Sequence, residues 1–352
     1  MGNSHLSEAM EVAYDLGWTD GLPVVPPTRE MVDPFLATTK WPADHVVAEL
    51  PPNGGNATVE KIAINAVMAG CKPEYFPVIL AAVSAISDER FSLQGVVGST
   101  HMATPVLVVN GPIRGPLQIN HGGNLLGPGY RANATIGRAV NLLLRNVGGS
   151  YPGTTSKSVF GQGGRFTCCF AEDDDANPWE PLHVERGFRR EDNTVTAFPG
   201  AAPQNIYNPG ADNAWAMLDT MADAMAALGN VQLRVMGDAM VVFSPHHVRL
   251  LSAAGLKKSD VKQYLFEHAR KSVEKVGLML GDGYSADLKR KLWPRWLNFE
   301  APGAMIPVVR RPEDILVVVA GGAGGPHSLY ISGWGSRAIT RKIEEKAGAR
   351  LE

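Results

Sequence analysis

The residues best suited to bind a ligand are concentrated between Asn110 and Arg138. An apolar run leads there into a glycine-rich segment, which leads into a helix-forming segment. Glycine lets the backbone approach a ligand closely, and the free N–H groups at a helix start attract an anion. Arginine forks bind carboxylates in a bidentate manner. We therefore expect an anion-binding loop rather than a structural turn with solvated arginines. Its expected substrate-binding residues are Arg114, Asn120, Asn124, Arg131, Asn133 and Arg138.

Histidines recur just after the apolar runs that we expect to be strands. They are His101, His121, the pair His246 and His247, and His327. In open α/β sheets, ligands bind outside the carboxyl ends of parallel strands. An imidazole there can move protons because its pKa lies near physiological pH. We expect His121 and His101 to be catalytic and His327 to bind substrate.

A carboxylate cluster, Glu172 to Asp175, follows the expected strand 166–170. Glu172 lies nearest the strand, so we predict that it is the catalytic acid or base, while the three aspartates cap a solvated turn. A divalent metal held with His183 is an alternative. The sequence has no HExxH, paired CxxC or EF-hand spacing, and its glycines do not follow GxGxxG or GxxxxGK[ST]. We therefore expect no metal, nicotinamide, flavin or nucleotide cofactor.

Cys168 and Cys169 are adjacent on the same expected strand. Successive strand residues point to opposite faces, so the two thiols cannot line one pocket. A nucleophilic thiol needs a nearby cation, and Arg165 is the one that the local sequence offers. Cys168 is thus a candidate catalytic thiol, and a thiol-dependent redox enzyme using Cys168 or Cys169 is an alternative function.

The elements that must position these residues alternate between strands and helices. Apolar strand-like runs are expected at 93–97, 106–109, 166–170, 239–243 and 315–319. Helices are expected at 59–69, between a Thr58 cap and Gly70, and at 133–146 and 214–228. The 38 glycines and 25 prolines lie between these elements. We predict an α/β fold with mixed or parallel sheets flanked by helices and with long Gly/Pro-rich loops.

A weak internal similarity suggests two related α/β halves. The segments 106–112 and 316–322 are both apolar runs that lead into glycine-rich loops, and a histidine follows each loop. We expect an N-terminal α/β domain over 1–200, containing the anion-binding loop, and a C-terminal α/β domain over 201–352.

Charge and composition exclude several classes of partner. The 33 Lys and Arg residues nearly balance 35 Asp and Glu residues, so no basic excess exists to bind nucleic acid. The most apolar segment, 76–87, is far shorter than the ~20 residues that span a bilayer. Three cysteines and an N-terminus without signal-peptide features predict a cytoplasmic protein with no membrane partner.

The segment 17–28, Gly-Trp-Thr-Asp-Gly-Leu-Pro-Val-Val-Pro-Pro-Thr, resembles the N-terminal signature of the bacterial UGSC-type (seleno)protein family. That family is named for a selenocysteine-Gly-Ser-Cys motif. The nearest stretch in this chain is Val97-Gly-Ser-Thr100, which lacks both redox atoms. The redox chemistry that the family name implies is therefore not carried over, and the resemblance assigns no catalytic residue.

These observations together predict an enzyme that acts on a small anionic, carboxylate-like molecule by general acid–base catalysis. Lyase, hydratase and hydrolase chemistry all fit, and a non-catalytic ligand-binding subunit is a further alternative. The proline-rich segment 17–28 suits a pocket lid or a subunit contact, and we expect a homo-oligomer.

Overall fold

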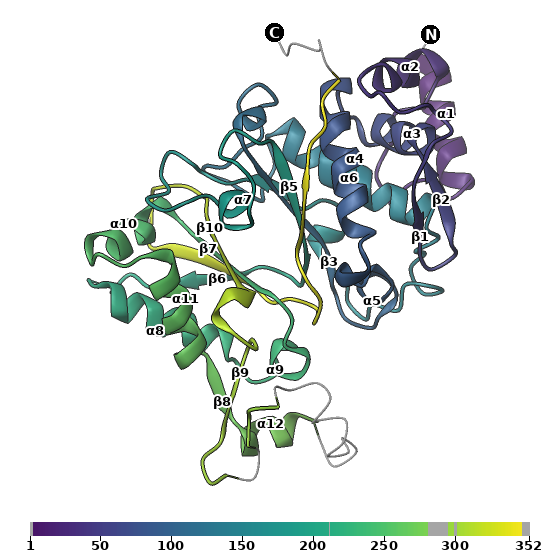
Figure 1. Ribbon diagram of the computed structural model, residues 1–352. Coiled ribbons are helices and arrows are strands. Elements are labelled where there is room, and N and C mark those ends of the chain that lie inside the picture. The colour runs from purple at the N-terminus through teal and green to yellow at the C-terminus, as the bar shows by residue number, and fades with distance from the viewer. Residues whose placement is uncertain (1–2, 211, 281–294, 299–300, 347–352) are drawn as a thin grey trace.

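The structure, a computed structural model, describes residues 3–210, 212–280, 295–298 and 301–346. Two four-stranded mixed sheets face each other, and helices cover the outer side of each sheet (Figure 1). The predicted α/β class, with mixed sheets flanked by helices, is confirmed.

The first sheet has the order β12-β5-β3-β4. Its strands are β12 (Ile339–Lys342), β5 (Thr194–Gly200), β3 (Thr104–Asn110) and β4 (Cys169–Ala171). β4 runs parallel to β3, whereas β3 with β5 and β5 with β12 are antiparallel pairs. β12 belongs to this sheet although it lies near the end of the described chain.

The second sheet has the order β10-β7-β11-β6. Its strands are β10 (Ile315–Val319), β7 (Ala239–Phe243), β11 (His327–Ile331) and β6 (Gln204–Tyr207). β10 runs parallel to β7, and the remaining neighbours are antiparallel. The pattern of directions therefore repeats that of the first sheet.

The two sheets exchange strands. In chain order, β3, β4, β5 and β6 form one unit, and β7, β10, β11 and β12 form another. In each unit the second strand pairs with the first in parallel, and the third pairs with the first in the antiparallel direction. The fourth strand of each unit leaves its own sheet and pairs with the third strand of the other unit, β6 with β11 and β12 with β5. Each sheet is thus completed by the other unit.

The connections that carry these exchanged strands cross at glycines. Gly200 and Gly333 form an isolated antiparallel bridge, and the Ala201 N–H donates to the Ser332 carbonyl at 2.8 Å. A Cβ atom on Gly333 would lie 2.0 Å from the carbonyl oxygen of Asp238. A side chain has no room at Gly333, so glycine is required there.

Side-chain alternation along the central strands divides the apolar residues into three layers. Val106 and Val108 of β3 face the second sheet, where they meet Met240 and Val242 of β7. The alternate residues of β3, such as Leu107, face the outer helices. Both faces of the central strands are buried, which explains why the sequence shows unbroken apolar runs there rather than alternation.

The three outer helices predicted at 59–69, 133–146 and 214–228 are present; the first has the predicted bounds, the second starts two residues earlier and the third ends three residues earlier. Against the first sheet pack α3 (Val59–Ala69), α4 (Phe76–Ile86) and α6 (Arg131–Asn146). Thr58 caps α3 by accepting from the Lys61 N–H, and Gly70 ends it with φ 86°. Against the second sheet pack α8 (Ala214–Met225), α10 (Pro245–Ala253) and α11 (Lys258–His268).

The segment 93–97 was expected to be a strand, and that prediction is wrong. It forms the short helix α5 (Leu93–Gly98). The buried residues Leu93, Val96 and Val97 have the i, i+3, i+4 spacing of one helix face.

The other helices are α1 (Asn3–Asp15), α2 (Arg29–Ala37), α7 (Leu182–Glu185), α9 (Gln232–Val235) and α12 (Val273–Leu280). The other strands form two hairpins, β1 (Val46–Leu50) with β2 (Gly55–Thr58) and β8 (Arg270–Ser272) with β9 (Met305–Pro307). The β8–β9 pair and α12 project from the second unit (Figure 1). Within the described ranges, no helix has the length and apolar character needed to cross a membrane.

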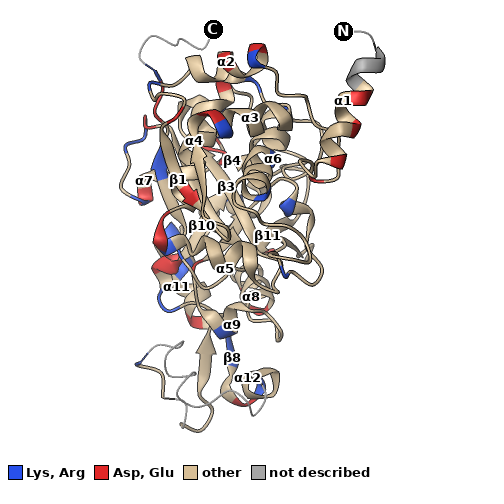
Figure 2. Ribbon diagram, turned by 90° about the vertical axis from the view of Figure 1, so that its right-hand side faces the viewer, with Lys and Arg blue, Asp and Glu red and all other residues tan. Residues whose placement is uncertain are grey.

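Charged side chains are absent from β3 and β10 and gather on the surrounding helices and loops (Figure 2). One ion group connects α7 with α11, where Glu185 pairs with Lys258 at 3.0 Å and also with Lys262. These charges therefore hold outer elements together.

The crossing of the exchanged connections makes Gly333 a test of the fold. We expect Gly333→Ala to lower the free energy of unfolding by about 2 kcal/mol or more, because the added methyl overlaps backbone. Gly210→Ala is the matched control, since a Cβ there meets nothing within 4 Å. Urea denaturation of both variants measures the difference. Equal, small effects would contradict the close crossing.

Candidate functional site

The carboxyl ends of four strands come together at one place in the molecule. The Glu172 N–H donates to the Val109 carbonyl at 3.2 Å, which joins the ends of β4 and β3. The Ala320 N–H donates to the Phe243 carbonyl at 3.0 Å, which joins the ends of β10 and β7. The Asp173 N–H then donates to the Val319 carbonyl at 2.8 Å. The two sheets thus present their strand ends side by side.

Two glycine-rich loops extend from these ends and contact each other. We call 111–130 the first loop and 320–326 the second loop. The Gly321 N–H donates to the His121 carbonyl at 2.7 Å. A Cβ atom on Gly322 would lie 3.1 Å from the Cα of Gly123. Small residues are needed where the loops meet, which gives these glycines a physical role.

A cavity of about 380 Å³ lies beside this contact. We call it the two-loop pocket. The first loop contributes Asn124, Leu125, Leu126 and Gly127, and Ser244, Gly321, Gly322 and His327 are among the residues on the other side. Asn124 and His327, both predicted as substrate-binding residues, therefore line one pocket although they are far apart in the sequence.

The imidazole of His327 is held in a defined orientation at this pocket. Its ring stacks on Tyr207 with the centroids 4.8 Å apart. Its Nδ1 lies 3.2 Å from Oδ1 of Asn205. An amide oxygen only accepts hydrogen bonds, so Nδ1 carries the proton in the neutral ring and Nε2 has a free lone pair. His327 is exposed, and it can exchange a proton with a bound molecule.

Ser244 adds a polar group that no described residue satisfies. It is 5% exposed, its Oγ has no hydrogen-bond partner, and it lines the two-loop pocket. Ser244 immediately precedes α10, whose first N–H groups carry a partial positive charge. A serine at this position usually caps the helix, but here its hydroxyl makes no cap bond. The hydroxyl and the helix start can together hold an anion.

A serine–histidine contact lies next to the two-loop pocket, between β11 and α10. Nδ1 of His247 lies 2.7 Å from Oγ of Ser328. Burial, with the charges of His246 and His327, lowers the pKa of His247 to about 4. Ser328 alternates with His327 and so shares the helix-facing side of β11 with Tyr330. This neutral pair connects α10 to the sheet, and Ser328 itself also lines the two-loop pocket.

Glu172, predicted as the catalytic acid or base, is placed where it cannot reach a ligand. It is 0% exposed. One carboxylate oxygen accepts from Asn110 Nδ2 at 2.6 Å and from the Leu182 N–H at 2.8 Å. The other accepts from Asn177 Nδ2 at 3.0 Å. Burial raises the pKa of Glu172, and Lys258 and these donors oppose the rise. Glu172 therefore organises the strand ends, which corrects its predicted role.

The three aspartates that follow Glu172 contact side chains of the first loop. Nδ1 of His121 lies 3.4 Å from Oδ2 of Asp173. Arg114 pairs with Asp174 and Asp175, in each case at 3.4 Å. Arg114 and His121, predicted to bind substrate and to transfer protons, thus contact carboxylates of the protein. Their positions do not place them in the two-loop pocket.

Three predicted binding residues hold the first loop instead of lining the pocket. Asn133 is buried, and its amide accepts from the Asn120 N–H at 2.8 Å and donates to the Asn120 carbonyl at 3.0 Å. The Asn120 side chain donates to the Gly123 carbonyl at 3.1 Å. Arg131 donates to the Gly70 carbonyl at 2.9 Å, where α3 ends. These contacts correct the expectation that all three side chains face a substrate.

Arg138, the last predicted binding residue, holds the N-terminal segment 17–28, which we call the strap. Its guanidinium makes two bonds of 2.8 Å to the carboxylate of Asp20 and one of 2.9 Å to the Pro23 carbonyl. Asn146, at the end of α6, donates to the Trp18 carbonyl at 2.9 Å. Arg138 and Asn146 are therefore occupied by the strap and do not face the two-loop pocket.

The cysteines lie on opposite faces of the first sheet, as predicted. Cys168 faces the second sheet and Cys169 faces the helices. Burial raises the pKa of Cys168 to about 12. A protonated thiol enclosed in an apolar layer is a poor nucleophile, so the placement corrects the expectation of a catalytic Cys168.

His101 follows helix α5 and not a strand, so it does not join the strand ends. Its ring stacks on Trp334 with centroids 5.0 Å apart. Burial, together with Arg165, lowers its pKa. His101 is thus remote from the two-loop pocket, and its predicted catalytic role has no support there. In the part of the chain that the structure describes, no three His, Cys, Asp or Glu side chains are grouped to hold a metal ion.

Three polar pocket residues, Ser244, Asn205 and Ser328, were missed from the sequence. Ser244-Pro245 has the signature of a helix start, serine at the cap and proline at the first position, so Ser244 was recognisable. Asn205 was not, because it reaches the pocket only through the strand exchange.

Comparison with known proteins adds no relative. No family model matches the sequence, and no curated protein is significantly similar to it. The resemblance of 17–28 to the UGSC-type family stays a prediction.

The contacts of Glu172 predict a strong effect of a conservative change. In Glu172→Gln an NH₂ group replaces one carboxylate oxygen. Both oxygen positions face hydrogen-bond donors, so an acceptor is lost wherever the NH₂ group lies. We expect the free energy of unfolding to fall by about 2–4 kcal/mol, because buried bonds to a charged group are lost. Asp175→Asn is the control, since Asp175 is 86% exposed and should change stability by less than about 0.5 kcal/mol. Similar values for both in urea denaturation would contradict this structural role.

Burial of His247 predicts a pH dependence of stability. Its pKa is about 4 in the folded protein and about 6.5 in the unfolded chain. Between these values the unfolded chain binds more protons, so stability falls as the pH falls from about 6.5 towards about 4. His247→Gln should flatten the fall in Tm between pH 7 and pH 5, whereas His45→Gln, at an exposed histidine, should not. Parallel Tm profiles for wild type and His247→Gln would rule this out.

Proposed function

We propose that this protein is an enzyme that acts on a small anionic organic molecule by general acid–base catalysis in the two-loop pocket. One observation carries the proposal. An oriented imidazole, an unsatisfied serine hydroxyl and a helix start border the same cavity of about 380 Å³. Ligand pockets are commonly about 300–1,000 Å³, so this cavity suits a metabolite of modest size.

The anion-binding half of the site is Ser244 and the start of α10. The Ser244 hydroxyl can donate to a carboxylate oxygen, and the free N–H groups of the helix add a favourable dipole. An anion at this place would also remove the cost of a buried, unpartnered hydroxyl. Anion binding thus rests on the helix start, not on the arginines that the sequence suggested.

The proton-transfer half is His327. With Nδ1 hydrogen-bonded to Asn205, the free Nε2 can take a proton from the substrate, and the resulting imidazolium can return it. Stacking on Tyr207 limits rotation of the ring. General acid–base groups typically contribute about 10²–10⁴-fold to rate. Lyase, hydratase and hydrolase reactions all need such a step, and the pocket is compatible with each.

A non-catalytic ligand-binding protein is the second candidate, and the apolar walls of the pocket favour it. Leu125, Leu126, Val242 and Leu329 line the cavity and would bind the carbon skeleton of a ligand without reacting with it. The expected homo-oligomer stays a prediction in either case.

Proton exchange with solvent tests the proposal without knowledge of the product. The protein is incubated in D₂O with lactate, malate, fumarate and succinate separately, and ¹H NMR follows the loss or shift of carbon-bound proton signals. We expect exchange or addition at the carbon next to a carboxylate for at least one acid. His327→Gln should slow it about 10²-fold or more.

His45→Gln, which removes an exposed imidazole elsewhere, is the control and should keep the wild-type rate. Saturable binding of an acid with no proton exchange would favour the ligand-binding alternative. Exchange that survives His327→Gln unchanged would exclude His327 as the catalytic group.

A further inference from the structure

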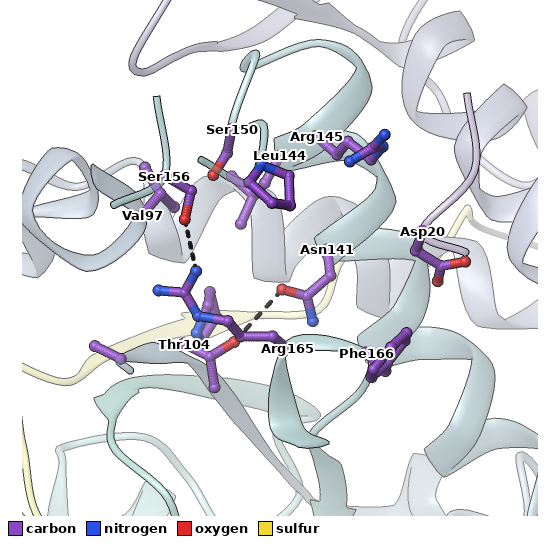
Figure 3. Close-up of a pocket in the computed structure, with 13 residues that line it drawn as sticks. Asp20, Val97, Thr104, Asn141, Leu144, Arg145, Ser150, Ser156, Arg165 and Phe166 are labelled. Carbon is purple, nitrogen blue, oxygen red and sulfur yellow. Dashed lines mark hydrogen bonds between the residues drawn. The ribbon is translucent and has the colours of Figure 1, made fainter. Parts of the chain in front are cut away.

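A second cavity, of about 180 Å³, lies at the opposite end of the first sheet (Figure 3). It borders Thr104 and Pro105 at the start of β3, whereas the two-loop pocket lies at the strand ends. Asp20 of the strap and Val97 also line it, so the two segments singled out by their sequence, 17–28 and 97–100, meet at this place. We call it the arginine pocket. Its other polar lining residues are Asn141, Arg145, Ser150, Ser156 and Arg165.

Arg165 is a largely buried cation that has no carboxylate partner among the described residues. One terminal nitrogen donates to Ser156 Oγ at 2.8 Å, and the other donates to the carbonyls of Val96 at 3.4 Å and His101 at 3.3 Å. Its Nε is buried and makes no hydrogen bond. Burial lowers the pKa of Arg165, and no neighbouring carboxylate raises it. Neutral acceptors therefore satisfy part of this guanidinium and leave its charge uncompensated.

Arg145 adds a second positive charge to the same cavity. Its Nε donates to the Gly17 carbonyl at 3.3 Å, and its guanidinium lies 5.1 Å from the ring centre of Tyr151. Among the described residues it forms no ion pair. Asp20, the carboxylate that lines the pocket, is bound by Arg138 through two bonds of 2.8 Å. The pocket thus has an excess of positive charge, and burying an unpaired charge costs free energy.

The remaining walls are apolar and limit the size of an occupant. They are formed by Val97, Ala103, Pro105, Leu144, Pro152 and Phe166. A cavity of about 150 Å³ accommodates a benzene-sized molecule, so this one fits a short carbon skeleton and is too small for a nucleotide. An inorganic anion would leave the apolar walls unused.

We propose that the arginine pocket binds a small organic carboxylate, with the carboxylate on Arg165 and the carbon skeleton against Val97 and Leu144. The guanidinium keeps its Nε and one hydrogen of the nitrogen that contacts Ser156 for charge-assisted hydrogen bonds to a carboxylate. Arg145 lies close enough to line the same space and adds attraction. The site is separate from the proposed catalytic pocket and does not depend on it. Because the strap and α6 both border it, an occupant connects the N-terminal segment to the first sheet.

Calorimetric titration of the full chain at constant ionic strength tests this site. Benzoate and butyrate are the carboxylate probes, benzamide is the uncharged counterpart of benzoate, and sulfate is the inorganic anion. We expect saturable binding of at least one carboxylate, and no comparable binding of benzamide or sulfate. Arg165→Gln should weaken carboxylate binding at least about tenfold, because a charge-assisted pair is lost.

Arg165→Lys provides a second variant in case Arg165→Gln does not fold, since it keeps the charge and loses the planar fork; it too should weaken binding. Arg29→Gln, at an exposed arginine, is the control and should bind as wild type does. The proposal is overturned if neither carboxylate binds, if benzamide or sulfate binds equally well, or if Arg165→Lys binds with wild-type affinity. Binding that is lost in His327→Gln and kept in Arg165→Gln would place the ligand in the two-loop pocket, which also overturns it.

Discussion

The reciprocal exchange of β6 and β12 is the constraint on which the rest of the structure depends. Each sheet needs its fourth strand from the other unit, so neither sheet is complete alone. The exchange forces two connections to cross at Gly200 and Gly333, where a side chain has no room. It also fixes how the sheets face each other, with Val106 and Met240 in one shared apolar layer. Because the sheets are joined in this way, the ends of β3, β4, β7 and β10 cannot separate without disrupting strand pairing. The strand ends are therefore a rigid base for the two loops.

The functional pocket follows from that base through two further requirements. Glu172 gathers donors from three segments around one buried carboxylate, which costs desolvation and is offset by good hydrogen bonds. Glycines then allow the two loops to touch at Gly123 and Gly322. Most polar side chains near the strand ends are used by the protein itself. The Ser244 hydroxyl has no hydrogen-bond partner among the described residues and borders the same cavity as His327, and this is why the proposed chemistry is assigned to these two groups.

The sequence was informative about local structure and less so about which side chains face a ligand. Apolar runs and caps predicted β3, β7, β10 and the helices α3, α6 and α8, because burial and capping act over a few residues. The strand prediction for 93–97 failed because a short apolar run fits both the strand and the helix pattern. The internal similarity matched the segment of β3 with that of β10, whereas the strand order makes β7 the counterpart of β3. The apolar composition of a strand does not show which strands it will pair with. Arg131, Arg138 and Glu172 were expected in the site because their types suit catalysis. Their partners, Gly70, Asp20 and Asn110, lie far away in sequence, so spacing could not reveal that these side chains were already occupied.

The central claim is that the two-loop pocket presents an oriented His327 to a bound anion. Long-range ¹H–¹⁵N NMR of the imidazoles tests it most directly, with signals assigned from His327→Gln and with lactate, malate, fumarate and succinate as ligands. The account predicts that neutral His327 carries its proton on Nδ1, and that its signals shift on addition of at least one acid while those of His45 stay in place. A His327 ring protonated on Nε2, or one whose signals do not respond to any of the four acids, would contradict the account.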